Sequence, residues 1–241
     1  MIQYIRSVLF IFQVYLMMLL MGIFFAPYAI ISPNGARLAC KSYCKWTFWT
    51  ASWMVGVKGE VRGDIPDGEV IIAAKHQSFF DIMLIFHALP SAKFIMKREI
   101  LWTPVIGLYA KRLGCVPVDR GKRGAAIQKM VEDVEAGHSL PGQLIIYSQG
   151  TRVAPGDYKP YKIGTSVLYE QLGQPCVPVA TNVGLFWPRK GIMRYPGTGV
   201  VEFLPPVLPG KDRDTFMADL EKQVEDRSNS LMKEAGFDPK N

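Results

Sequence analysis

The sequence has few of the residues that build metal centres and disulfide frameworks. Its 241 residues include three histidines and four cysteines. The cysteines show neither a Cys-x-x-Cys spacing nor a histidine nearby, as zinc sites would require; they are Cys40, Cys44, Cys115 and Cys176. The sequence therefore predicts reduced thiols in a cytosolic compartment and no bound metal.

Acidic residues are missing from the first 59 residues, which contain five basic residues. These five account for five of the seven units of formal net charge, so the rest of the chain carries only +2. The positive charge is concentrated in one segment. This distribution indicates a membrane surface as the partner and argues against a nucleic-acid footprint.

Charge of either sign is absent between Ser7 and Ala36. Most of this stretch, Val8–Ile31, is aliphatic or aromatic, and a helix needs about 20 such residues to span hydrocarbon. A signal peptide is the alternative, but its apolar core has only about 7–15 residues and a cleavage site should follow it. Here Pro33-Asn34-Gly35 indicates a turn instead. We expect either a membrane span or the first arm of a shallow helical hairpin.

The next segment, Ala36–Val57, mixes basic residues with tryptophan and phenylalanine. This mixture is typical of an interfacial helix, with cations at the headgroups and rings at the acyl boundary, although an ordinary core helix is the alternative. The sequence thus predicts an N-terminal membrane-associated helix pair within a membrane-anchoring segment, residues 1–56. Three cations follow the apolar run and only Arg6 precedes it, which places the rest of the chain on the cytoplasmic side.

From residue 57 onward, short apolar runs alternate with helical stretches. The predicted strands are Val57–Arg62, Val70–Ala74, Lys93–Met96, Cys115–Asp119, Gln143–Ser148, Cys176–Ala180 and Gly199–Phe203. The predicted helices are Phe80–Ala88, Glu99–Leu113 with a kink or break at Pro104, Arg123–Ala136, Gly164–Gln171 and Asp212–Lys233. This order predicts an α/β domain over residues 57–241, with a mixed, largely parallel sheet flanked by helices. We assign the last helix a packing role only.

A histidine and a carboxylate follow the first buried strand, in Lys75-His76-Gln77-Ser78-Phe79-Phe80-Asp81. At a strand-to-helix turn, Asp81 can hold one ring nitrogen of His76 while the other takes a proton from a hydroxyl. A buried histidine satisfied by a local carboxylate is the alternative. Cations also follow several strands: Lys97, Arg120 and Arg152. Each alone would be a solvated surface residue, but together they predict an anion site, with Gly150 allowing close backbone approach.

Four blocks in order carry a resemblance. They are His76-Gln-Ser-Phe-Phe-Asp81, Val118-Asp119-Arg120, Ser148-Gln149-Gly150-Thr151-Arg152 and Val177-Pro178-Val179. Together they resemble the glycerolipid acyltransferases, and among these the bacterial 1-acylglycerol-3-phosphate acyltransferases. The resemblance covers roughly residues 69–181. One block alone is weakly specific, whereas four in order are strongly specific.

The resemblance implies transfer of a fatty acyl group from acyl carrier protein or coenzyme A to the hydroxyl of lysophosphatidic acid, which gives phosphatidic acid at the cell inner membrane. It implies His76 as general base and Asp81 as its orienting partner, without a metal, another cofactor or a covalent acyl-enzyme. It also implies substrate-binding residues, in the third block and among the cations: Lys97, Arg120, Gln149, Gly150, Thr151, Arg152 and Lys162.

Two residues depart from the family pattern. Lys75 stands where asparagine is commoner, and Gln149 replaces the usual glutamate of the third block. An amide keeps the shape of the carboxylate but loses its charge, which affects the expected acceptor. One alternative is therefore acyl transfer to another lysolipid, such as lyso-ornithine lipid or a lysophospholipid. A lipid hydrolase is less favoured because no Gly-x-Ser-x-Gly elbow exists, and a non-catalytic lipid-binding protein because the His76/Asp81 pair is intact.

Overall fold

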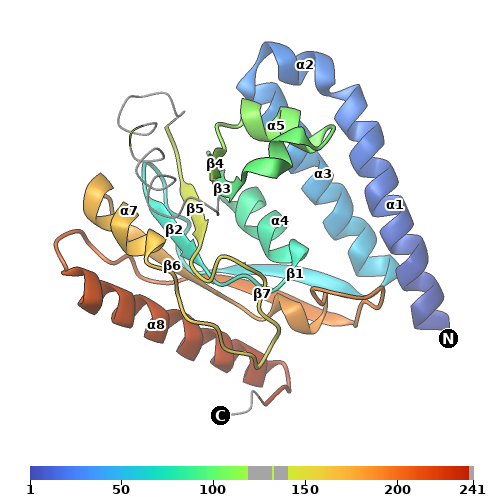
Figure 1. Ribbon diagram of the computed structural model, residues 1–241. Helices are drawn as coiled ribbons and strands as arrows, with labels where there is room; N and C mark the ends of the chain where they lie inside the picture. The colour runs from blue at the N-terminus through green and yellow to red at the C-terminus, as the bar shows by residue number, and fades with distance from the viewer. Residues whose placement is uncertain (119–131, 133–140, 239–241) are drawn as a thin grey trace.

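The computed structural model describes residues 1–118, 132 and 141–238 (Figure 1). The chain begins with helices α1 (Ile2–Phe24), α2 (Ala26–Ile31) and α3 (Pro33–Met54). Prolines stand in the first turns of α2 and α3, where a missing amide hydrogen costs nothing, and Ser32 caps α3. The uncharged apolar stretch therefore forms two helices, α1 and α2. Helix α1 packs along α3, and these two form the N-terminal helix pair that the sequence predicted.

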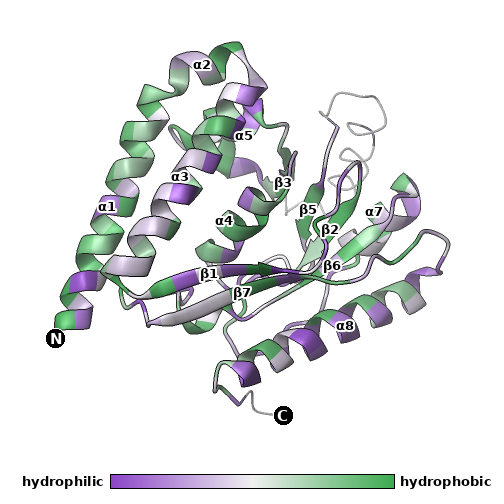
Figure 2. Cartoon of the chain, turned by 180° about the vertical axis from the view of Figure 1, so that it is seen from behind, coloured by the Kyte–Doolittle hydropathy of each residue, from purple (hydrophilic) through white to green (hydrophobic). Residues whose placement is uncertain are grey.

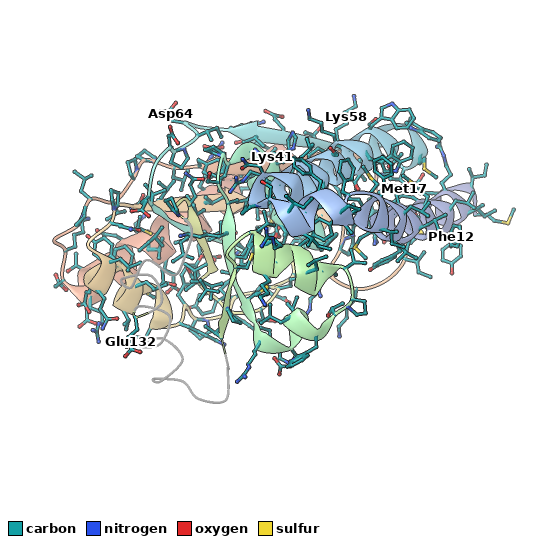
Figure 3. The ribbon with its side chains drawn as sticks, turned by 90° about the horizontal axis from the view of Figure 1, so that it is seen from above. Phe12, Met17, Lys41, Lys58, Asp64 and Glu132 are labelled. Atoms are coloured by element: carbon teal, nitrogen blue, oxygen red, sulfur yellow. The ribbon has the colours of Figure 1, made fainter. Side chains whose placement is uncertain are left out.

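Helix α1 carries most of its apolar side chains on the outside of the molecule. Among the described residues, it is the one helix long and apolar enough to cross a membrane, and only 17% of its most apolar window is buried. Phe12 is 67% exposed, and Figure 3 shows its ring pointing away from the molecule. Figure 2 shows the contrast with α8 (Arg213–Glu234), which is largely hydrophilic. The structure therefore supports membrane association through α1.

The domain is built on a seven-stranded sheet. Its strands are β1 (Val57–Arg62), β2 (Ile71–Ala74), β3 (Lys93–Lys97), β4 (Val116–Val118), β5 (Leu144–Tyr147), β6 (Cys176–Thr181) and β7 (Gly197–Phe203). Their spatial order is β1-β7-β6-β2-β5-β3-β4, and every neighbouring pair is parallel except β6 with β7. The predicted mixed, largely parallel α/β sheet is confirmed.

Alternation along the strands divides the core into two layers. In β2, Ile72 and Ala74 pack with α1, α3 and α4 (Phe79–Ala88), whereas Ile71 and Ala73 face α7 (Gly164–Leu172) and α8. The strand is buried on both faces, as expected for the centre of a parallel sheet. In α8, Phe216, Leu220 and Val224 supply the apolar stripe on the second side; all three are fully buried.

Two of the predicted helices need comment. The single helix predicted over Glu99–Leu113 is two pieces, the 3₁₀ turn η1 (Arg98–Trp102) and α5 (Ile106–Arg112). The break lies at Pro104, which cannot donate a helical hydrogen bond. The predicted helix Arg123–Ala136 lies outside the described residues apart from Glu132. A short 3₁₀ turn, η2 (Val183–Leu185), was not predicted from the sequence.

Candidate active site

Strand order brings the separate sequence blocks to one edge of the sheet. Strand β5 lies between β2 and β3, and all three run parallel, so their carboxyl ends open on the same side. The loop after β2 carries His76, the loop after β5 begins at Ser148, and β3 ends at Lys97. Loops at this edge are where open α/β sheets bind ligands.

Asp81 holds the imidazole of His76. Asp81 Oδ1 lies 2.8 Å from His76 Nδ1. Asp81 Oδ2 accepts hydrogen bonds from the backbone amides of Gln77 and Ser78, at 2.8 and 2.7 Å. Ser78 is the N-cap of α4 and Asp81 its third residue, so the orienting carboxylate is also half of a capping box. Because Nδ1 is engaged, Nε2 is the nitrogen that can accept a proton.

Tyr147, at the end of β5, completes this cluster. Its hydroxyl donates to Asp81 Oδ1 at 3.1 Å, and its ring stacks on the imidazole of His76 with centroids 3.9 Å apart. Burial and the neighbouring carboxylate raise the pKa of Tyr147 well above its usual value, so the hydroxyl remains a donor. Asp81 is fully buried, whereas His76 is 13% exposed. His76 is therefore the member of the cluster that a substrate can reach.

His76 opens on a cavity of about 1070 Å³. Most of its wall is apolar and comes from α1, α3, α4 and α5, including Met18, Ala39, Met83 and Leu113. At the apolar part of this wall, α5 contacts α1. There, Tyr109 donates its hydroxyl to the carbonyl of Gly22 at 2.8 Å, and a Cβ on Gly22 would clash with Val105. The cavity joins the His76–Asp81 pair to the space beneath the N-terminal helices.

The other end of the cavity is cationic. Lys97 and Arg152 line it, as the sequence predicted for an anion site. Lys162, which the resemblance implied, and Arg189, which the sequence did not suggest, line it as well. Arg189 donates to the backbone carbonyl of Arg152 at 2.8 Å, and Lys97 pairs with Glu99 at 3.0 Å. Arg120, the remaining predicted cation, lies outside the described residues.

The turn of the third block depends on Gly150. Its φ of +66° is a left-handed conformation that other residues adopt only with strain. A Cβ at this position would come within 2.7 Å of Lys162 Nζ, so the lysine side chain lies directly over the glycine. The amide of Lys162 also donates to the carbonyl of Ser148 at 2.8 Å. The block and its continuation thus form one folded unit at the cavity wall, where Thr151 lies as well.

Both departures from the family pattern meet at one carboxylate. Glu225, on α8, accepts a hydrogen bond from buried Lys75 at 2.5 Å and another from Tyr161 at 3.0 Å. The amide of Gln149 points to the same carboxylate at 3.4 Å and donates to the carbonyl of Lys159 at 3.1 Å. Gln149 is only 2% exposed. Its predicted role in holding the acceptor remains a prediction, while its observed contacts are with α8.

The sequence alone could not reveal three of these residues. Glu225 lies in a helix to which only a packing role was assigned, about 150 residues from Lys75. Tyr147 has the signal of an ordinary strand residue, and Arg189 lies in a loop without a motif. A weak signal existed for Glu225, because Lys75, a lysine where the family usually has asparagine, requires a counter-charge if it is buried.

Comparison with known proteins agrees with this geometry. A model of the family described as "Acyltransferase" matches residues 57–182. A 1-acyl-sn-glycerol-3-phosphate acyltransferase of Pseudomonas aeruginosa is 27% identical over 191 residues, which cover 78% of this chain and 74% of that protein. The alpha form of the enzyme from Mus musculus is 30% identical over 163 residues, 65% of this chain and 57% of the mouse protein.

A solved structure shares the whole fold. The 1-acyl-sn-glycerophosphate (LPA) acyltransferase PlsC of Thermotoga maritima superposes with a TM-score of 0.78 at 20% identity, covering 95% of this chain and 97% of that one. The fold and the sequence blocks at the site are those of an acyltransferase. The chain belongs to the acyltransferase family, as its four blocks predicted.

The contact between Gln149 and Glu225 leads to a prediction about the family's usual residue. Gln149→Glu, made alone, places two carboxylates together in a buried site and removes the donor to Lys159, so we expect a lower melting temperature. Adding Glu225→Gln leaves one carboxylate for Lys75 and should recover part of the loss. The coupling free energy from the four variants should be about 0.5–3 kcal/mol. Strictly additive effects in thermal unfolding would show that the two residues do not interact.

Proposed function

We propose that the protein is a 1-acylglycerol-3-phosphate O-acyltransferase that makes phosphatidic acid from lysophosphatidic acid and an acyl thioester. One observation carries this proposal: the His76–Asp81 pair opens on a single cavity that is cationic at one end and apolar at the other. Lysophosphatidic acid and a fatty acyl thioester together present a phosphate, a free hydroxyl and apolar chains. The names of the relatives from Pseudomonas aeruginosa and Mus musculus support the same reaction.

The chemistry requires a base and no covalent intermediate. His76 Nε2 takes the proton from the acceptor hydroxyl as its oxygen attacks the thioester carbonyl carbon. The carbon–sulfur bond breaks, and the thiol leaves with the proton that His76 returns. Asp81 fixes the Nδ1–H tautomer and stabilises the imidazolium, and the Tyr147 hydroxyl and backbone amides hold Asp81 in place.

The two ends of the cavity suit the two kinds of substrate group. Arg152, Lys162 and Arg189 offer the cationic donors that a phosphomonoester requires, with Lys97 as a further point charge. We assign Arg120 to the same phosphate from the resemblance, together with Gly150 and Thr151. The apolar end, between α1, α3 and α5, takes the acyl chain.

A hydrolase with a covalent intermediate fits this site poorly. Ser148 is buried, and its hydroxyl oxygen accepts a hydrogen bond from Thr165 at 3.2 Å. Burial raises the pKa of Cys115 to about 11 and that of Cys176 to about 12, so both thiols are protonated near neutral pH. Neither hydroxyl nor thiol has the activated form that a nucleophile needs.

We further propose that residues 1–56 are the anchoring segment and residues 57–241 the catalytic domain, on the cytoplasmic side of the inner membrane. The exposed apolar side chains of α1 and the basic, aromatic surface of α3 support this division. The acyl carrier protein or coenzyme A thioester would approach from the cytoplasm. The lysolipid would come from the bilayer that holds α1.

The first prediction from this proposal concerns the base. General-base catalysis contributes about 10²–10⁴-fold, so His76→Ala should lower kcat by at least that order with the fold intact by circular dichroism. Asp81→Asn should lower kcat as well because the productive tautomer is no longer favoured. The assay is acyl transfer in detergent to a panel of lysolipids from both thioesters. Near-wild-type transfer by folded His76→Ala, or an acyl-enzyme trapped on Ser148, would contradict the mechanism.

The second concerns the acceptor phosphate. Arg152→Lys replaces a bidentate fork by a point charge and should raise the KM for lysophosphatidic acid about ten- to a hundredfold, since charged hydrogen bonds contribute about 1.5–3 kcal/mol. Arg120→Lys should act in the same direction. Arg213→Lys is the matched control, because Arg213 pairs with Glu170 at the start of α8. An unchanged acceptor KM in both Arg120 and Arg152 variants would move the phosphate site elsewhere.

The third concerns the anchor. The full chain, expressed in cells and washed with alkaline carbonate, should remain in the membrane pellet because α1 presents a long uncharged surface. Binding that persists through α3 alone should weaken as salt is raised, since cations attract headgroups electrostatically. Quantitative release into the supernatant would rule out stable insertion of α1.

A further inference from the structure

A second concave site lies on the outer face of α3, away from the catalytic cavity. It has a volume of about 520 Å³ and is lined by residues of α3 together with His87 from the end of α4; the α3 residues are Asn34, Arg37, Leu38, Lys41, Ser42 and Lys45. The catalytic cavity uses other residues of α3, including Ala39 and Tyr43. The two sites share no lining residue, so α3 separates them.

Three cations in this groove have no acidic partner. Arg37, Lys41 and Lys45 are spaced four residues apart and therefore share a helix face. Among the described residues, no carboxylate lies within ion-pair distance of any of them. Burial and the charges of Lys41 and Lys45 lower the pKa of His87. Burial and the charges of Arg37 and Lys45 lower the pKa of Lys41 as well. No described carboxylate therefore neutralises the positive charges of Arg37, Lys41 and Lys45.

The groove also contains unsatisfied polar atoms. Arg37 donates through Nη1 to Asn34 at 3.1 Å, which fixes the guanidinium at the groove, yet its Nε is buried without a partner among the described residues. Nδ1 of His87 is buried and unpaired there as well, and it donates in one neutral tautomer and accepts in the other. Buried polar groups normally have a partner, so the unpaired Nε–H of Arg37 indicates that a hydrogen-bond acceptor is missing.

The surroundings of the groove identify the kind of anion. Ile30 and Ile31, on α2, are 59% and 79% exposed beside the start of α3. Trp49 and Trp53 continue the outer face of α3 and are 57% and 55% exposed. Exposed isoleucine and tryptophan around a cationic groove match a lipid, whose phosphate lies at the same depth as interfacial tryptophan rings. A soluble phosphate would not need these apolar borders.

We propose that this groove binds the phosphate of an anionic phospholipid headgroup, at a site distinct from the catalytic cavity. Arg37 and the two lysines contact the phosphate, and the exposed rings of α3 rest beside its acyl chains. The bound lipid holds α3 at the membrane surface and so fixes the orientation of the cavity on the other face of the same helix. The proposal rests on the proposed membrane association and is independent of the acyl-transfer chemistry.

The test measures lipid binding to the full chain in non-ionic detergent by native mass spectrometry, with phosphatidylglycerol and phosphatidylcholine as probes. The wild type should retain phosphatidylglycerol in preference to phosphatidylcholine. Lys41→Ala with Lys45→Ala should weaken phosphatidylglycerol binding at least about tenfold, as expected when charged contacts are lost. Lys41→Arg with Lys45→Arg should keep it, which shows that charge and not side-chain shape is required.

Lys222→Ala with Lys233→Ala is the matched control, because it removes the same charge from α8, where the two lysines pair with Asp226 and Asp238. The control should bind like the wild type, and thermal unfolding should show that all variants are folded. An equal loss in the control, or no preference for phosphatidylglycerol in the wild type, would overturn the proposal. Displacement of the lipid by millimolar inorganic phosphate would also overturn it, because a free anion would then be the ligand.

Discussion

The structure of the site depends on one buried carboxylate. Asp81 is fully enclosed, and burial of an unpaired charge would be costly. It is stabilised by two backbone amides at the start of α4, by the Tyr147 hydroxyl and by His76. The same carboxylate that caps the start of the helix therefore orients the imidazole of His76. Helix capping and the geometry of the His76–Asp81 pair cannot be separated here, because one side chain makes both sets of contacts.

In the third block an amide stands where the family usually has a carboxylate, and this amide contacts a carboxylate from another element. A glutamate is usual at position 149 in the family that this chain resembles, and here the negative charge comes from Glu225 on α8. Lys75 requires this charge because its ammonium group is buried. A helix on the far side of the sheet is thereby tied to the backbone beside His76. The substitution of Gln149 is consistent with an intact site.

Helix α3 lies between two different surfaces. One of its faces lines the apolar part of the cavity that contains His76, and another face carries cations and exposed tryptophan rings. A helix with two such faces can be neither a simple core helix nor a simple interfacial one. Its small residues, such as Ala36 and Ala39, are buried, while Lys45, Trp49 and Trp53 are exposed. One helix thus borders both the cavity and the cationic, tryptophan-bearing surface.

The sequence by itself determined the order and type of most elements, the four blocks, and the pairing of His76 with Asp81. These are local or periodic properties: alternation along strands, a capping box within four residues, and uncharged length in α1. Only the tertiary structure decided which strands are neighbours, and hence that Tyr147 contacts Asp81 and Glu225 meets Lys75. Such contacts join residues 66 and 150 positions apart, and no local pattern encodes them. The cavity likewise exists only because α1, α3 and α5 pack against one another.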